Sequence, residues 1–188
     1  TLYVEECGNP TGFPALFLHG GPGAGCKPLH RCFFNPALYR IVLLDQRGAG
    51  RSRPSGAVQE NTTAELLDDL EAIRQTLAIP SWLVFAGSWG VTLALLYAEA
   101  HPERVAGLIL RGSFLARRMD LDWFIGEQGV RRIYPDAWER LLHSLPEPDR
   151  LKPLEALHLH LNGSDELAQR RAARAWEQWS SQIVLGDA

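Results

Sequence analysis

Four short apolar runs in this chain end abruptly at small or polar residues, as strands do where they lead into loops. They cover residues 14–18, 39–44, 82–86 and 105–110. Their apolar residues are nearly continuous rather than alternating, which is typical of parallel strands covered on both faces by helices. Residues 2–6 are expected to form the tail of an antiparallel edge strand.

Helical patterns separate these strands. The segment from Thr62 to Glu65 has the form of a capping box and opens a helix that continues to Leu77. A second helix, rich in Leu and Ala, is predicted for residues 89–100, and the His-Pro pair at 101–102 ends it. This alternation of strand and helix specifies a doubly wound, mostly parallel sheet.

The strand signal disappears after residue 114, and only helices are predicted beyond it. Four helical segments follow, over residues 122–130, 135–142, 153–161 and 165–184. In the last segment an apolar stripe recurs at helical spacing, formed by Ala172, Trp176, Trp179 and Ile183. We therefore expect two domains, a core over residues 1–114 and a helical cap over residues 115–188.

Composition narrows the function classes. With 46% hydrophobic and 22% charged residues, the chain has the balance of a soluble globular protein. Its net charge is −3, and no basic stripe of the kind that binds nucleic acid is evident in the sequence, so no nucleic-acid partner is expected. No apolar run is long enough to span a bilayer, and no signal-peptide pattern opens the chain. Three cysteines in no metal-ligand spacing predict no metal site and a reducing, cytoplasmic compartment.

The strongest chemical signal is the sequence Ala-Gly-Ser-Trp-Gly at residues 86–90, where a buried strand leads directly into a helix. A nucleophilic serine in such a tight turn needs small neighbours, and its hydroxyl then stands at a helix N-terminus. Ala86 replaces the first glycine of the G-x-S-x-G pattern, which is the smallest possible departure. We interpret Ser88 as the nucleophile; the alternative is a serine in an ordinary strand-to-helix turn.

A glycine-rich loop from His19 to Gly25 follows the first strong strand. Glycines let the backbone approach a substrate carbonyl closely. The backbone N–H groups of Gly21 and Trp89 are predicted to form an oxyanion hole. The loop lacks the Gly-Lys-Ser/Thr of a P-loop and the third glycine of a dinucleotide fingerprint. His19 lies on the oxyanion side, so we interpret it as a residue that orders this loop rather than as the catalytic base.

A third motif, Asp-Gln-Arg-Gly-Ala-Gly-Arg-Ser at residues 45–52, closes the next strand. Asp45 and Arg47 stand where catalytic side chains often lie, so a catalytic role is open to them. We favour a structural role, in which these two side chains tie neighbouring loops together.

In this order and spacing, HGGPG, DQRGxGRS and GSWG resemble the proline iminopeptidase family of the α/β-hydrolase superfamily. The likeness extends along essentially the whole chain, through residues 61–63, 110–114, 122–124, 134–138 and 173–179. It implies an α/β-hydrolase fold with a helical cap and an acyl-enzyme on Ser88. The implied substrate is a small peptide whose N-terminal proline is released, with no cofactor. The expected substrate-contacting residues are Gly20, Phe124, Trp176 and Trp179.

Two features depart from this family. The family has a Glu that helps to hold the substrate amine directly after the second cap Trp, and here Ser180 follows Trp179. An esterase or other acyl hydrolase on the same scaffold is therefore an alternative. The superfamily also places its acid and histidine after the cap, and no histidine of this chain fits that role. We expect the natural protein to continue beyond Ala188 with its last strands; a catalytically incomplete fragment is the second alternative.

Overall fold

The computed structural model describes residues 1–186, apart from the side chain of Leu185. The chain divides into two compact units, Thr1–Ala116 and Arg117–Ala188. Residues 187 and 188, the last two of the predicted cap, lie outside the described residues. Among the described residues, no helix combines the length and the apolar character that crossing a membrane requires.

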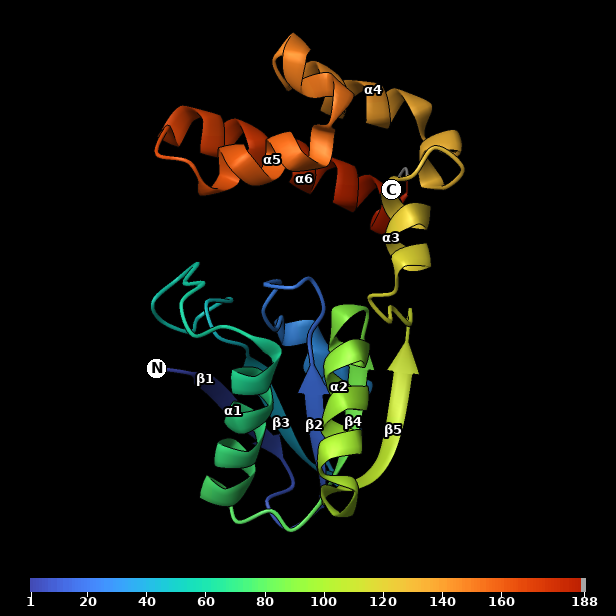
Figure 1. Ribbon diagram of the computed structural model, residues 1–188. Helices are drawn as coiled ribbons and strands as arrows, with labels where there is room; N and C mark the ends of the chain where they lie inside the picture. The colour runs from blue at the N-terminus through green and yellow to red at the C-terminus, as the bar shows by residue number, and fades with distance from the viewer. Residues whose placement is uncertain (187–188) are drawn as a thin grey trace. The chain divides into compact units, whose positions relative to one another are not determined.

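The first unit is built on a five-stranded sheet (Figure 1). Its strands are β1 (Tyr3–Gly8), β2 (Phe13–Leu18), β3 (Tyr39–Asp45), β4 (Trp82–Gly87) and β5 (Val105–Arg111). They lie in the order β1-β3-β2-β4-β5. β1 runs antiparallel to β3, and the other neighbours are parallel. The four predicted parallel strands and the antiparallel edge strand are confirmed.

Helices α1 (Thr63–Thr76) and α2 (Trp89–Ala100) cover one face of this sheet (Figure 1). The predicted capping box is present, because the backbone N–H of Thr62 donates to the Glu65 carboxylate at 2.7 Å. Alternate strand residues meet the two helices in a core that includes Leu16, Val42, Val84, Leu70, Leu93 and Tyr97. This packing fixes the direction of β4 and α2 on either side of Ser88.

Helices were predicted on both faces of the sheet, but the other face is covered differently from the first. The structure places there a short 3-10 helix, η1 (Pro28–Phe33), which the sequence pattern did not indicate. A smaller apolar core forms beneath it from Ala15, Phe17, Phe34, Ile41 and Leu43. Phe33 stacks on Phe85 with ring centroids 5.1 Å apart, while Ile109 on β5 stays 44% exposed.

The second unit is helical, with its own core. Its longer elements are α3 (Arg118–Ile125), α4 (Pro135–His143), α5 (Pro153–Asn162) and α6 (Glu166–Leu185). Short 3-10 turns, η3 (Val130–Arg132) and η4 (Glu147–Leu151), connect them. The predicted stripe on α6 is confirmed, because Ala172 and Trp179 are buried in this core while Trp176 and Ile183 pack against it.

The helix predicted over residues 122–130 is wrong in its bounds, because α3 covers Arg118–Ile125. α3 starts four residues earlier, where the Arg117 backbone N–H donates to the Asp120 carboxylate at 3.1 Å and caps the first turn. It ends at Gly126, whose extended backbone leaves the helix while its N–H still donates to the Asp122 carbonyl at 2.7 Å. The capping contacts, not the apolar pattern, set these boundaries.

A buried polar cluster joins α1 to α2. The Glu71 carboxylate accepts two hydrogen bonds of 2.8 Å from Arg74 and one of 2.5 Å from the Tyr97 hydroxyl. Arg74, 6% exposed, also donates to the Ile79 carbonyl at 2.5 Å. The hydrogen bonds from Arg74, and secondarily from Tyr97, lower the pKa of Glu71 to about 2.

Glu71→Gln is expected to lower the free energy of unfolding by about 2 kcal/mol at pH 7, because a charged acceptor is lost. The Glu71 pKa is depressed in the folded chain relative to about 4.3 in an unfolded chain. The charge therefore stabilises the fold above about pH 4.3, and this contribution disappears as the pH falls toward about 2. Urea denaturation at several pH values should show the two proteins converging in acid. Glu99→Gln, at an exposed position on α2, is the matched control; a gap that does not narrow contradicts the prediction.

Candidate active site

Ser88 occupies a strained turn between β4 and α2. Its backbone has φ 55° and ψ −122°, a combination that non-glycine residues rarely adopt and that costs about 1–3 kcal/mol. Its N–H donates to the Arg111 carbonyl at 3.1 Å, and its carbonyl accepts from Val91 at 2.9 Å. The side chain is exposed. The surrounding strands thus hold a strained, accessible serine at the N-terminus of α2.

Two glycines allow the loop after β2 to pass close to this turn. A Cβ at Gly90 would lie 2.5 Å from the Leu18 carbonyl oxygen. A Cβ at Gly20 would lie 3.0 Å from both the Gly87 carbonyl oxygen and the Ser88 Cβ. Neither position has room for a larger residue, so the glycines bring the glycine-rich loop against the serine.

The two predicted oxyanion donors have no competing acceptor. Trp89 is the first residue of α2, and the first N–H groups of a helix have no partner within it. Gly21 has φ 117°, a conformation that favours glycine. Within the described part of the chain, neither backbone N–H is hydrogen-bonded. Both groups therefore retain the capacity to bind a negatively charged oxygen.

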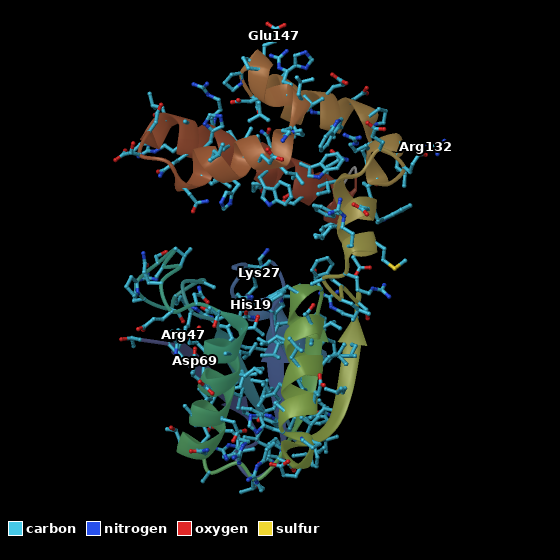
Figure 2. All side chains as sticks on the ribbon, viewed as in Figure 1. His19, Lys27, Arg47, Asp69, Arg132 and Glu147 are labelled. Carbon is cyan, nitrogen blue, oxygen red and sulfur yellow. The ribbon has the colours of Figure 1, made fainter. Side chains whose placement is uncertain are left out.

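His19 is buried at the loop end of β2 (Figure 2), and both of its ring nitrogens are engaged. The backbone N–H of Gln46 donates to Nε2 at 3.1 Å, so the ring proton lies on Nδ1, which donates to the Gly20 carbonyl at 2.8 Å. Burial lowers the pKa of His19 and favours the neutral ring. The predicted loop-ordering role is confirmed, since no nitrogen of this ring is left to accept a proton from Ser88.

Asp45 and Arg47 tie loops together, as predicted. The buried Asp45 carboxylate accepts from the backbone N–H of Cys26 at 2.7 Å, and from the backbone N–H and side-chain Nε of Arg51 at 2.9 and 2.8 Å. Burial alone would raise the pKa of Asp45, but these hydrogen bonds hold it below its ordinary value. Arg47 makes two hydrogen bonds to Asp69 on α1, of 2.6 and 2.9 Å (Figure 2).

The aromatic candidates belong to the second unit. Phe124 lies 5.7 Å from Trp176 and 6.4 Å from Trp179, centroid to centroid, and both Phe124 and Trp176 are partly exposed. Trp179 is 1% exposed and packs edge-on to Trp138 at 5.2 Å. Trp179 is therefore buried in the core of the second unit, whereas Phe124 and Trp176 are the more exposed of these three predicted substrate-contacting residues.

Ser180 occupies the position after Trp179 at which the resembled family has a Glu, and Glu177 is the carboxylate one turn earlier on the same helix. The Ser180 hydroxyl donates to the Trp176 carbonyl at 2.9 Å, within its own helix. Glu177 is exposed and accepts from the Ser181 hydroxyl at 2.9 Å. Ser180 is thus neutral and turned toward the helix backbone, which leaves no negative charge at its position.

No histidine within residues 1–116 hydrogen-bonds Ser88. His30 stacks on Phe17 with ring centroids 4.3 Å apart, and His101 packs against Tyr97 at 5.2 Å. Among the described residues, no group of three or more His, Cys, Asp or Glu side chains is placed to hold a metal ion.

Sequence reasoning gave no role to Gln46, which the structure places among these groups. Gln46 is 3% exposed, and its side chain contacts both the His19 carbonyl and the Trp89 indole. Its position inside the motif at residues 45–52 was the available signal.

This mostly parallel sheet, with a strained serine between β4 and α2, has the organisation of an α/β-hydrolase. A family model described as the alpha/beta hydrolase fold matches residues 14–187, and the chain belongs to that family.

Several curated relatives are named proline iminopeptidase. The protein from Arabidopsis thaliana is 54% identical over 180 residues, covering 95% of this chain and 47% of its own length. The protein from Neisseria meningitidis serogroup B is 50% identical over 183 residues, covering 97% of this chain and 59% of its own length. The chain thus spans about half the length of the curated relatives it matches.

Solved structures agree on the fold. A proline iminopeptidase-related protein from Thermus thermophilus superposes with a TM-score of 0.54 at 24% identity, over 97% of this chain and 62% of its own. An epoxide hydrolase from Vigna radiata superposes with a TM-score of 0.54 at 21% identity, over 87% of this chain and 51% of its own. At these identities the likeness concerns the fold alone.

Proposed function

We propose that this protein is a serine hydrolase that releases N-terminal proline from peptides through an acyl-enzyme on Ser88. The observation that carries the proposal is the exposed, strained Ser88 between β4 and α2, beside two unbonded backbone donors. The names of relatives at about half identity support the choice of substrate.

In the proposed reaction the Ser88 Oγ attacks the carbonyl carbon of the substrate proline. The carbonyl oxygen becomes negatively charged and accepts hydrogen bonds from the N–H groups of Gly21 and Trp89, the latter at the positive end of α2. A base takes the serine proton and passes it to the leaving amine, and water then hydrolyses the acyl-enzyme. Within residues 1–116 no histidine hydrogen-bonds Ser88, and we do not assign the base to a residue of this unit.

We further propose that the helical second unit acts as a cap whose partly exposed Phe124 and Trp176 contact the proline ring. Aromatic side chains commonly line such apolar pockets. Gly20, where a Cβ would lie 3.0 Å from the Ser88 Cβ, is proposed to let the loop backbone approach the substrate carbonyl. The cytoplasm is the proposed compartment, supported by three cysteines that form no disulfide.

One observation favours a second candidate function, an esterase or other acyl hydrolase. A substrate with a cationic N-terminus benefits from a nearby carboxylate, and Ser180 supplies none because it is neutral and bonded to its own helix. An ester substrate has no such requirement.

The two candidates separate in a substrate comparison with the protein expressed from its complete reading frame. We expect kcat/KM for prolyl-naphthylamide to exceed that for short-chain nitrophenyl esters. N-acetylprolyl-naphthylamide, which lacks the free amine, is the matched control and should not be cleaved. Turnover of the esters without turnover of the prolyl amide would favour the second candidate. Failure of a fluorophosphonate probe to label Ser88 would exclude both.

A further inference from the structure

The Gln46 side chain bridges the two segments that supply the proposed oxyanion donors. Gln46 directly follows β3, and its amide is buried. The amide nitrogen Nε2 donates to the His19 carbonyl at 3.0 Å. The amide oxygen Oε1 accepts from the indole Nε1 of Trp89 at 3.2 Å. One side chain thus joins the glycine-rich loop to the first residue of α2.

The backbone of Gln46 adds a second connection to the same loop. Its N–H donates to His19 Nε2 and fixes the orientation of the His19 ring. The ring in turn donates from Nδ1 to the Gly20 carbonyl and so fixes the orientation of that carbonyl. Gly21 follows immediately in the chain. The peptide group that carries the Gly21 N–H is therefore held through His19, and the Trp89 ring is held by the Gln46 side chain.

We propose that Gln46 is a positioning residue that sets the separation of the Gly21 and Trp89 N–H groups. The inference rests on the proposed function, in which these groups stabilise the oxyanion. A primary amide offers a donor and an acceptor at once, and both are used here. A methionine of similar length offers neither, and a glutamate lacks the donor while bringing a negative charge near the oxygen that becomes negative in the reaction.

The test uses Gln46→Met, in the protein expressed from its complete reading frame. Misplacement of catalytic groups by an ångström costs about 100-fold in rate. We expect the rate of Ser88 labelling by a fluorophosphonate and the kcat for prolyl-naphthylamide to fall together by about 10- to 100-fold. KM should change less than about twofold, because the hole acts on the transition state. Gln75→Met, at an exposed position on α1, is the matched control and should retain the parent rates.

A second variant covers the case in which Gln46→Met does not fold. Trp89→Phe keeps the backbone N–H but removes the indole donor to Gln46, together with part of a ring that packs against the core. We expect kcat and the labelling rate to fall by about 10-fold in a protein that still folds. Parent-like rates in whichever of the two variants fold would overturn the inference. A raised KM with unchanged kcat would overturn it also, because that result indicates substrate contact. An unlabelled parent protein would overturn the proposed function and this inference with it.

Discussion

Ser88→Ala is expected to lower kcat for prolyl amides by roughly a millionfold, the scale seen when a serine nucleophile is removed from a hydrolase. The effect is large because the proposed acyl-enzyme forms on the Ser88 hydroxyl, which alanine lacks. Turnover by the protein from its complete reading frame, and mass spectrometry of the fluorophosphonate-labelled peptide, would measure it. Ser55→Ala, at an exposed loop position, is the matched control. Substantial residual turnover, or a label on another residue, would contradict the assignment.

A glycine at the same position separates chemistry from strain. Ser88→Gly also removes the nucleophile, but glycine adopts φ 55° without a steric penalty. We expect Ser88→Gly to be more stable than Ser88→Ala by about 1 kcal/mol, because relief of strain outweighs the added chain entropy of glycine. Urea denaturation of both variants measures the difference. Equal or lower stability of the glycine variant would mean that the turn stores no strain.

Asp45→Ala is expected to lower the free energy of unfolding by about 3–5 kcal/mol, the scale of breaking a buried charged pair. The Asp45 side chain is fully buried and holds the backbone N–H groups of Cys26 and Arg51. Its removal leaves these donors unsatisfied and releases Arg51 from its carboxylate partner. Chemical denaturation monitored by tryptophan fluorescence provides the measurement.

Asp68→Ala is the matched control for charge. Asp68 lies on α1 and is exposed, so its loss should change stability by less than about 0.5 kcal/mol. If Asp45→Ala destabilises the chain no more than this control, the loops around the active site do not depend on the buried carboxylate. The stability of Asp45→Asn should lie between those of Asp45→Ala and Asp68→Ala, because its amide oxygen can still accept from one backbone N–H.

The centre of the site was predictable because its signals are local. The apolar run of β4, the small residues around Ser88 and the helix that follows adjoin one another in the sequence. A serine in that context must turn tightly between strand and helix. The order of strand and helix likewise indicated the parallel sheet.

Features that depend on distant partners were not predictable in the same way. The role of Gln46 arises from contacts to His19 and Trp89, which come from other parts of the chain. The sequence offered both a pocket and a core for the aromatic stripe on α6, and the burial of Trp179 in the core became visible only in the structure. The start of α3 depended on a side-chain cap at Asp120 rather than on apolar spacing.

The central place of β2 in the sheet also determines when the strained turn at Ser88 can form during folding. Leu16 faces Val42 on one neighbouring strand and Val84 on the other, far along the chain. Pairing β2 with β4 closes a long segment of chain, and the entropy lost in this closure is offset only after the contacts between the two strands have formed. Such a sheet is expected to fold more slowly than a helical unit, whose contacts are local. The strained turn at Ser88 requires β4 to be seated beside β2. In a nascent or partly unfolded chain Ser88 therefore lacks its strained conformation, and the geometry proposed for the nucleophile exists only once the middle of the sheet has formed.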